Sequence, residues 1–79
     1  MHRKDQTRKL KVGLIGLGHW GPNLARNFAN HPKVILTFVC DTLPSAFDRI
    51  ENFATPTCIK TTNPEDVINS EEVEAVIVA

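Results

Sequence analysis

Features that would indicate a secreted, metal-binding or membrane protein are scarce in this chain. It has 79 residues, of which two are cysteine and none is tyrosine. Cys40 and Cys58 stand at no spacing that metal ligands use, so we expect reduced core thiols, with neither a metal site nor a disulfide. No apolar run approaches the roughly 18 residues that span a bilayer. Residues 12–17 are too short and too broken by glycine for a signal peptide. We therefore expect a cytoplasmic location and no membrane partner.

The charges cancel overall but are unevenly distributed. Nine Lys and Arg residues balance nine Asp and Glu residues, yet residues 1–11 carry five basic side chains against a single acid, Asp5. We expect residues 1–9 to be a disordered basic leader. So few charges ahead of a strand are more typical of a solvated leader than of a nucleic-acid-binding arm. No nucleic-acid partner is predicted.

Only four residues are glycine, and three of them form one motif. Gly16, Gly18 and Gly21 are spaced Gly-x-Gly-x-x-Gly directly after an apolar run that predicts a strand over residues 11–15. In such a motif the first glycine permits a tight turn and the second lets a pyrophosphate approach the backbone. The third glycine allows the following helix to pack closely on the strand. A lone motif of this kind is weak evidence, so its context decides its value.

A helix is expected directly after the glycines. Residues 19–30 carry Trp20, Leu24 and Phe28 one turn apart, an apolar stripe that predicts an amphipathic helix. We expect Trp20 to be a packing residue at the start of this helix rather than a platform on which a base stacks. His19 invites a catalytic interpretation, but a side chain that faces a bound cofactor is the simpler one.

A second strand and an acidic residue complete the context. Residues 34–40 are almost continuously apolar, as expected of a parallel strand covered on both faces. Asp41 follows directly. A carboxylate at the end of the second strand can accept hydrogen bonds from the ribose hydroxyls of an adenosine, and it repels a 2′-phosphate. The pattern therefore favours NAD over NADP as the ligand.

The rest of the chain continues the alternation of strands and helices. We predict a short helix over residues 44–53, a strand over 57–60, a third helix that Asn63 caps and that ends near residue 70, and a strand over 73–79. This order gives an α/β fold with a parallel sheet in the strand order 3-2-1-4. It is a partial Rossmann fold, truncated after strand 4, with its ligand cleft at the carboxyl ends of strands 1 and 4.

The length predicts that the domain is incomplete. A dinucleotide-binding domain of this type usually has about 150 residues, so residues 10–79 are expected to be its amino-terminal part. The rest of that domain and a substrate domain would then be absent. The fourth strand should expose a hydrophobic edge of the kind that native sheets avoid.

Other interpretations of these residues stay open. The glycines can form a strand-to-helix turn without a ligand, and Asp41 can be a solvated carboxylate or a helix cap. An S-adenosylmethionine methyltransferase also has a glycine-rich loop after its first strand and an acid after its second, although its loop generally lacks the third glycine. The chain can also be a truncated product with no independent function.

Residues 12–28, with the sequence VGLIGLGHWGPNLARNF, resemble the amino terminus of the Gfo/Idh/MocA oxidoreductases. Within that family the stretch looks most like the nucleotide-sugar 3-dehydrogenases, in which an aromatic residue or His followed by Trp-Gly-Pro-Asn is usual. Residues 39–41 and 73–79 are similar to the family's second and fourth strands. The resemblance covers residues 10–79, although only its first stretch is specific.

The resemblance implies an NAD-dependent oxidoreductase that transfers hydride between nicotinamide and a hydroxyl-bearing carbon of a sugar or nucleotide-sugar. It also implies a second, substrate-binding domain and a homo-oligomer. The family's catalytic Lys and His belong to motifs that this sequence does not contain, so no residue here inherits a catalytic role and the 79 residues alone should be inactive. Some members of the family are transcriptional regulators, which keeps a non-catalytic NAD sensor as the alternative.

Only contacts with the cofactor carry over to this sequence. The resemblance implies that the amides of the glycine turn contact the pyrophosphate and that two residues after the second strand lie at the adenosine ribose. Ala79 would lie near the nicotinamide side. The implied cofactor-binding residues are Gly16, Leu17, Gly18, His19, Trp20, Gly21, Asp41 and Thr42.

Overall fold

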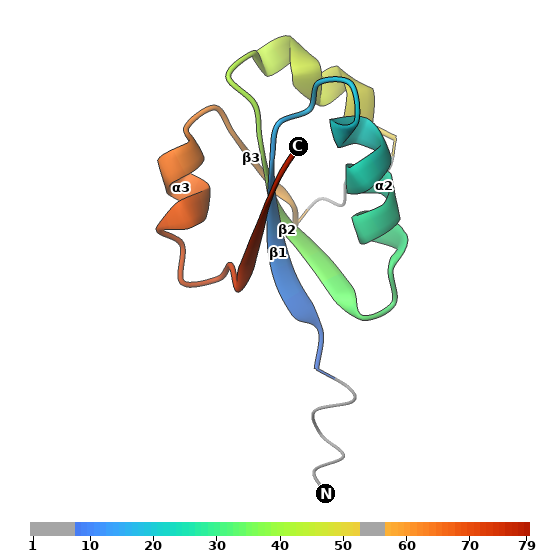
Figure 1. The fold of residues 1–79 in the computed structure, drawn as a ribbon, viewed down its shortest axis with the longest axis vertical. Coiled ribbons are helices and arrows are strands. Elements are labelled where there is room, and N and C mark those ends of the chain that lie inside the picture. Colours follow the sequence, from blue (N-terminus) through green and yellow to red (C-terminus); the bar gives the residue numbers. More distant parts are fainter. Residues whose placement is uncertain (1–7, 53–56) are drawn as a thin grey trace, which may run out of the picture.

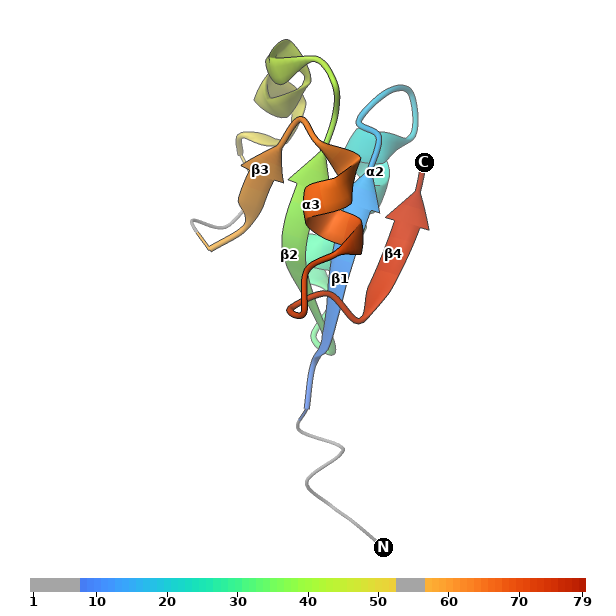
Figure 2. The same cartoon turned by 90° about the vertical axis from the view of Figure 1, so that its left-hand side faces the viewer.

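The computed structural model describes residues 8–52 and 57–79. Within this part, the elements in chain order are β1 (Leu10–Ile15), α2 (Gly21–Asn30), β2 (Val34–Cys40), the 3₁₀ helix η1 (Pro44–Ile50), β3 (Ile59–Thr61), α3 (Pro64–Ile68) and β4 (Ala75–Val78). The strands form one parallel sheet in the order β3-β2-β1-β4, which is seen best when Figure 1 is turned as in Figure 2, and which confirms the predicted α/β fold and strand order. Most of the expected leader, residues 1–7, lies outside the described residues.

Helices cover both faces of the sheet. On one face α2 packs against β2 and β1, with η1 beside it, and on the other face α3 packs against β1, β2 and β3 (Figures 1 and 2). The central strand β1 pairs with β2 on one side and with β4 on the other. Ile15 is opposite both Cys40 and Val78, so three strands end at the same level of the sheet.

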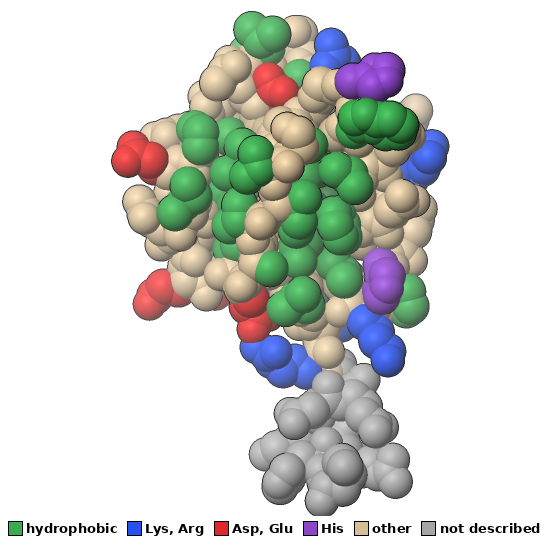
Figure 3. All heavy atoms as spheres, in the orientation of Figure 1, with side chains coloured by type: hydrophobic (Ala, Val, Ile, Leu, Met, Phe, Trp, Pro, Cys, Tyr) green, Lys and Arg blue, Asp and Glu red, His purple; other side chains and the backbone are tan. Residues whose placement is uncertain are grey.

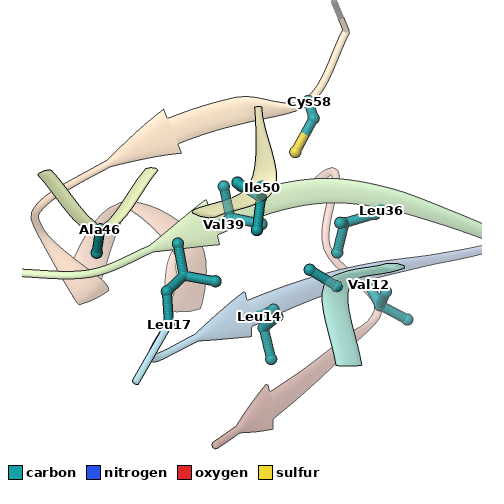
Figure 4. Close-up of a cluster of buried hydrophobic side chains, with 9 residues drawn as sticks. Val12, Leu14, Leu17, Leu36, Val39, Ala46, Ile50 and Cys58 are labelled. Carbon is teal, nitrogen blue, oxygen red and sulfur yellow. The ribbon is translucent and has the colours of Figure 1, made fainter. Parts of the chain in front are cut away.

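Each face of the sheet has its own hydrophobic core. Figure 4 shows the larger one, on the α2 side, where side chains from β1, β2 and η1 meet. Its labelled members are Val12, Leu14, Leu17, Leu36, Val39, Ala46, Ile50 and Cys58. The smaller core, under α3, contains Phe38, Cys40 and Val67. Because the two cysteines belong to different cores, they are separate, buried free thiols.

One irregularity in β2 decides which side chains enter which core. Val12 is opposite Leu36, but the next residue of β1, Gly13, is opposite Phe38, so β2 accommodates one extra residue at Thr37. An extra residue in a strand shifts the alternation of its side chains between the two faces. Leu36 therefore joins the α2 core, whereas Phe38, two residues later, joins the α3 core.

The boundaries of several elements differ from the prediction. The second helix is a 3₁₀ helix that ends at Ile50, and the predicted end at residue 53 lies outside the described residues. The third strand begins at Ile59 rather than at residue 57, and it includes Thr61. The fourth strand is confined to Ala75–Val78. The predicted cap is confirmed, because the Asn63 side chain accepts a hydrogen bond from the Glu65 amide at 3.0 Å.

The outer strand β4 leaves apolar side chains exposed. Val76 is 41% exposed and Val78 is 74% exposed, and Ile68 of α3 is exposed as well. Figure 3 shows hydrophobic side chains gathered on this face of the molecule, between the α3 and α2 sides. The predicted hydrophobic edge is therefore present. None of the helices in the described ranges combines the length and the hydropathy needed to cross a bilayer.

Candidate functional site

The glycine turn begins where β1 ends. Gly16 has φ of 103°, a region that favours glycine over residues with a side chain. Its amide donates to the Cys40 carbonyl at 2.7 Å, which holds the start of the turn against the end of β2. A Cβ atom at this position would also lie 2.9 Å from the Ala79 carbonyl oxygen. Both the backbone angle and the close approach of residue 79 therefore restrict this position to glycine.

The other two glycines of the motif have opposite surroundings. A Cβ atom on Gly21 would lie 2.3 Å from the Gly16 carbonyl oxygen, so α2 can begin this close to the strand only because the side chain is missing. A Cβ atom on Gly18 would meet no protein atom within 4 Å. Space beside Gly18 is therefore open to a ligand, and the fold itself does not require glycine there.

The peptide groups of Leu17 are held on both sides. The Leu17 amide donates to Asp41 Oδ2 at 2.8 Å, and the Leu17 carbonyl accepts from Arg49 Nη1 at 2.6 Å. The Leu17 side chain is fully buried in the α2 core. The Leu17 amide, which the sequence places at the pyrophosphate, donates to Asp41 in this structure, so its contact with a pyrophosphate stays a prediction.

The amides that follow Leu17 are the donors that remain. Among the described residues, none accepts a hydrogen bond from the amides of Gly18, His19 or Trp20. The adjoining helix α2 has no side-chain cap and no acidic residue in its first turn. Free amides at the start of a helix attract anions because they point along the positive end of the helix dipole. The turn can therefore bind a phosphate group through its backbone.

Asp41 is half-buried at the end of β2 and forms two hydrogen bonds with backbone amides. Oδ1 accepts from Leu43 at 2.9 Å and Oδ2 accepts from Leu17. These bonds, that from Leu43 first, lower the pKa of the Asp41 carboxyl, and the nearby positive charge of Arg49 lowers it further. Asp41 is therefore ionised at neutral pH. A carboxylate has about four lone-pair sites, so it retains the capacity to accept bonds from ribose hydroxyls.

His19 and Trp20 form an aromatic pair on the outside of the turn. Their ring centroids are 5.2 Å apart and the planes are inclined by 85°. Trp20 is 65% exposed, so the prediction that it packs at the start of the helix is wrong. The reason is that α2 begins at Gly21, which leaves Trp20 in the turn, while Leu24 and Phe28 pack against the core as expected.

The remaining predicted residues lie at the same end of the sheet. Thr42 follows Asp41 and is exposed. The Ala79 amide donates to the Ile15 carbonyl at 2.8 Å, which brings residue 79 beside the glycine turn. The structure thus gathers the turn, Asp41 and Ala79 at the carboxyl ends of β1, β2 and β4.

Arg49 is the site residue that the sequence did not indicate. It lies in the last turn of η1, 32 residues from the carbonyl that it binds. No motif spacing connects the two positions, and the only signal was a basic residue on the second helix. Its contact depends on how η1 folds back toward the glycine turn.

In the part of the chain that the structure describes, charged side chains also gather near the start of β1. A cavity of about 490 Å³ lies at the opposite end of the sheet, near Lys11 and Glu74. Opposite charges there neutralise one another in the pairs Arg8–Glu74 and Lys11–Glu72. In the described ranges, no group of three or more His, Cys, Asp or Glu side chains is placed to hold a metal ion.

Comparisons with known proteins agree with this geometry. The model of the family described as "Oxidoreductase family, NAD-binding Rossmann fold", GFO_IDH_MocA, matches residues 10–79. GenD2 from gentamicin A biosynthesis, solved in complex with NAD, is 27% identical with a TM-score of 0.75 over 91% of this chain. A comparison with curated proteins finds no match.

Two inositol dehydrogenases share the fold at lower identity. The myo-inositol dehydrogenase from Corynebacterium glutamicum has a TM-score of 0.76 at 20% identity over 90% of this chain. The scyllo-inositol dehydrogenase from Lactobacillus casei, solved with NAD(H) and scyllo-inositol, has a TM-score of 0.74 at 20% identity over 91% of it. The chain spans 20–22% of the length of the solved structures that it matches.

Proposed function

Because the chain belongs to the Gfo/Idh/MocA oxidoreductase family and carries its NAD-binding Rossmann fold, we propose that its glycine turn, Asp41 and Thr42 hold the NAD of a sugar or polyol dehydrogenase. The substrate would be a sugar, a nucleotide-sugar or a cyclic polyol. The observation that supports this most is the open space at Gly18 beside amides that have no acceptor among the described residues.

The residues fit the cofactor in two places. The amides of Gly18, His19 and Trp20 would bind the pyrophosphate, since they are the free donors of the turn. The Asp41 carboxylate would accept the ribose hydroxyls with the lone pairs that the Leu43 and Leu17 amides leave unused. Gly16 and Gly21 would serve by letting the turn take this shape.

These residues bind and orient the cofactor, and none of them has a place in proton transfer. When bound, NAD supplies the acceptor for a hydride from the substrate carbon. Ala79 ends the described chain beside the turn, on the side where the nicotinamide would lie. The family resemblance implies that the substrate and the general base are held by a second domain, and that the protein is a homo-oligomer. A cytoplasmic location and the nucleotide-sugar subgroup stay predictions.

The experiment that tests the function is a dehydrogenase assay on the natural full-length chain. NAD reduction is followed by absorbance with a panel of free sugars, inositols and nucleotide-sugars. The proposal expects NADH formation with at least one of these classes. If the protein binds NAD but reduces it with no member of the panel, the alternative of an NAD-sensing regulator is favoured instead.

A further inference from the structure

We propose that Arg49 sets the choice between NAD and NADP together with Asp41, by providing a positive charge that partly offsets the repulsion of a 2′-phosphate. The inference rests on the proposed position of the ribose at Asp41. It assigns to this chain a cofactor site that tolerates NADP and that prefers NADP once the Asp41 charge is removed.

The geometry places the two charges at opposite ends of one residue. Asp41 binds the Leu17 amide at 2.8 Å and Arg49 binds the Leu17 carbonyl at 2.6 Å. The charged groups are therefore separated by one residue of backbone and two hydrogen bonds, at most about 9 Å. A 2′-phosphate on a ribose held at Asp41 would lie within a few ångströms of that carboxylate, which is within the range of the Arg49 charge.

The charge of Arg49 acts on Asp41, whose pKa it lowers, but it forms no ion pair in the described ranges and can therefore also act on a ligand. The ion pairs within those ranges are Arg8–Glu74 and Lys11–Glu72. Its hydrogen bond to the Leu17 carbonyl uses one of five N–H donors of the guanidinium, and the side chain belongs to an exposed residue. A guanidinium with free donors is the group that best recognises a phosphate.

A purely structural role for Arg49 makes a different prediction. If Arg49 only fixes the Leu17 carbonyl, then its loss loosens the turn that binds the pyrophosphate, which NAD and NADP share. Both affinities would then fall by the same factor. A role in selection instead changes the ratio of the two affinities, because only NADP carries the 2′-phosphate.

The test measures the dissociation constants of NAD and NADP for the natural full-length chain by calorimetry. Arg49→Met removes the charge and keeps an unbranched side chain, and Arg49→Lys restores a charge. Arg26→Met is the matched control, since Arg26 is an exposed arginine on α2 that bonds only to Asn23 among the described residues. Circular dichroism checks that each variant is folded.

We expect Arg49→Met to raise the ratio of the NADP to the NAD dissociation constant about tenfold, the usual scale of a lost charge-assisted hydrogen bond. Arg49→Lys should largely restore the ratio, and Arg26→Met should leave it unchanged. Asp41→Asn should bind NADP better than NAD, and adding Arg49→Met should abolish that preference. If the wild type binds NADP too weakly to measure, the inference is tested by comparing the nucleotide preference of Asp41→Asn with that of the double variant.

Two results would overturn the inference, and they are distinguishable. Equal losses of NAD and NADP affinity in Arg49→Met would leave the proposed NAD site intact and reduce Arg49 to a support of the turn. Failure of the folded wild type to bind either nucleotide would overturn the proposed function, and the inference with it.

Discussion

The carboxylate of Asp41 joins two neighbouring loops, because it accepts hydrogen bonds from Leu17 in the glycine turn and from Leu43 after β2. Its proposed contact with a ribose is therefore coupled to the shape of the turn. Substitution of Asp41 changes both the ligand contact and the support of the loop. For this reason the ratio of two nucleotide affinities is more informative than the loss of one.

The hydrogen bonds to Asp41 should make the free energy of unfolding depend on pH. Since the folded state lowers the pKa of this carboxyl from its ordinary value of 3.8, the stabilisation is present above pH 3.8 and is lost as the pH falls through the lower, folded-state pKa. Asp41→Asn should therefore be less stable than the wild type at pH 7, and the difference should shrink below pH 3.8. Urea unfolding followed by circular dichroism at several pH values measures it. If the difference in stability between the wild type and Asp41→Asn stayed constant well below pH 3.8, the Asp41 carboxylate would not be the group that stabilises the fold.

Cys58 should be unreactive while the protein is folded. It is 7% exposed, and burial raises its pKa to about 11. At pH 8 only about one thiol in a thousand would be ionised, and the thiolate is the reactive form. A Cys40→Ala variant keeps Cys58 as the one cysteine of the 79 residues. We expect its thiol to react slowly with a disulfide reagent in buffer and fast in urea. Reaction in buffer at the rate of a free cysteine would show that this core is open.

At the scale of elements, the sequence predicted the alternation of strands and helices and the order of the strands. The elements follow from apolar runs and proline positions, which are local signals, and the strand order follows from the general handedness of parallel connections. It did not predict the extra residue at Thr37, because residues 34–40 are almost all apolar and give no sign of where the alternation shifts. The exposure of Trp20 was also not predicted, because the sequence does not fix the residue at which α2 begins. Since α2 begins at Gly21, Trp20 lies just before the helix and is exposed.

The candidate site was predictable to the extent that it lies in local motifs. The glycine spacing and the position of Asp41 are both readable along the chain, and the structure brings them together. Two features were not readable. The use of the Leu17 amide by Asp41 depends on the exact distance between two loops, and the contact of Arg49 depends on the path of η1.

The close packing of α3 on β1 can be tested by substitution at Gly13. A Cβ atom on Gly13 would lie 2.4 Å from Cγ1 of the buried Val67. Gly13→Ala should therefore destabilise the fold by about 2 kcal/mol, a usual cost of overfilling a core. The measurement is the free energy of unfolding in urea.

Val67→Ala is the partner variant for this test, because it removes the methyl group that the new Cβ would meet. The double variant should lose less stability than the sum of the two single losses, as expected of side chains in contact. Strictly additive losses would show that α3 does not lie this close to β1.

For the whole molecule, the glycine turn, Asp41 and Ala79 lie at the end of the sheet where β1, β2 and β4 finish. Ligands of open parallel sheets bind at this end, where the strand order changes direction. The side chains of β4 beside this site are exposed. The chain spans 20–22% of the length of its relatives, whose other parts lie outside this comparison. We propose that this end of the sheet supplies the contacts that bind the dinucleotide.

The most direct test of that claim is calorimetric titration of NAD into the natural full-length chain, as wild type, as Gly18→Ala and as Asn27→Ala. Gly18 can take a methyl group without a protein clash, so its variant should fold normally and lose affinity only because the methyl occupies the space of the pyrophosphate. Asn27 is exposed on α2 and serves as the control. We predict equal binding by the wild type and Asn27→Ala, and binding about tenfold weaker by Gly18→Ala, on the scale of one lost bond to a charged group. Wild-type affinity in Gly18→Ala would contradict the proposed site.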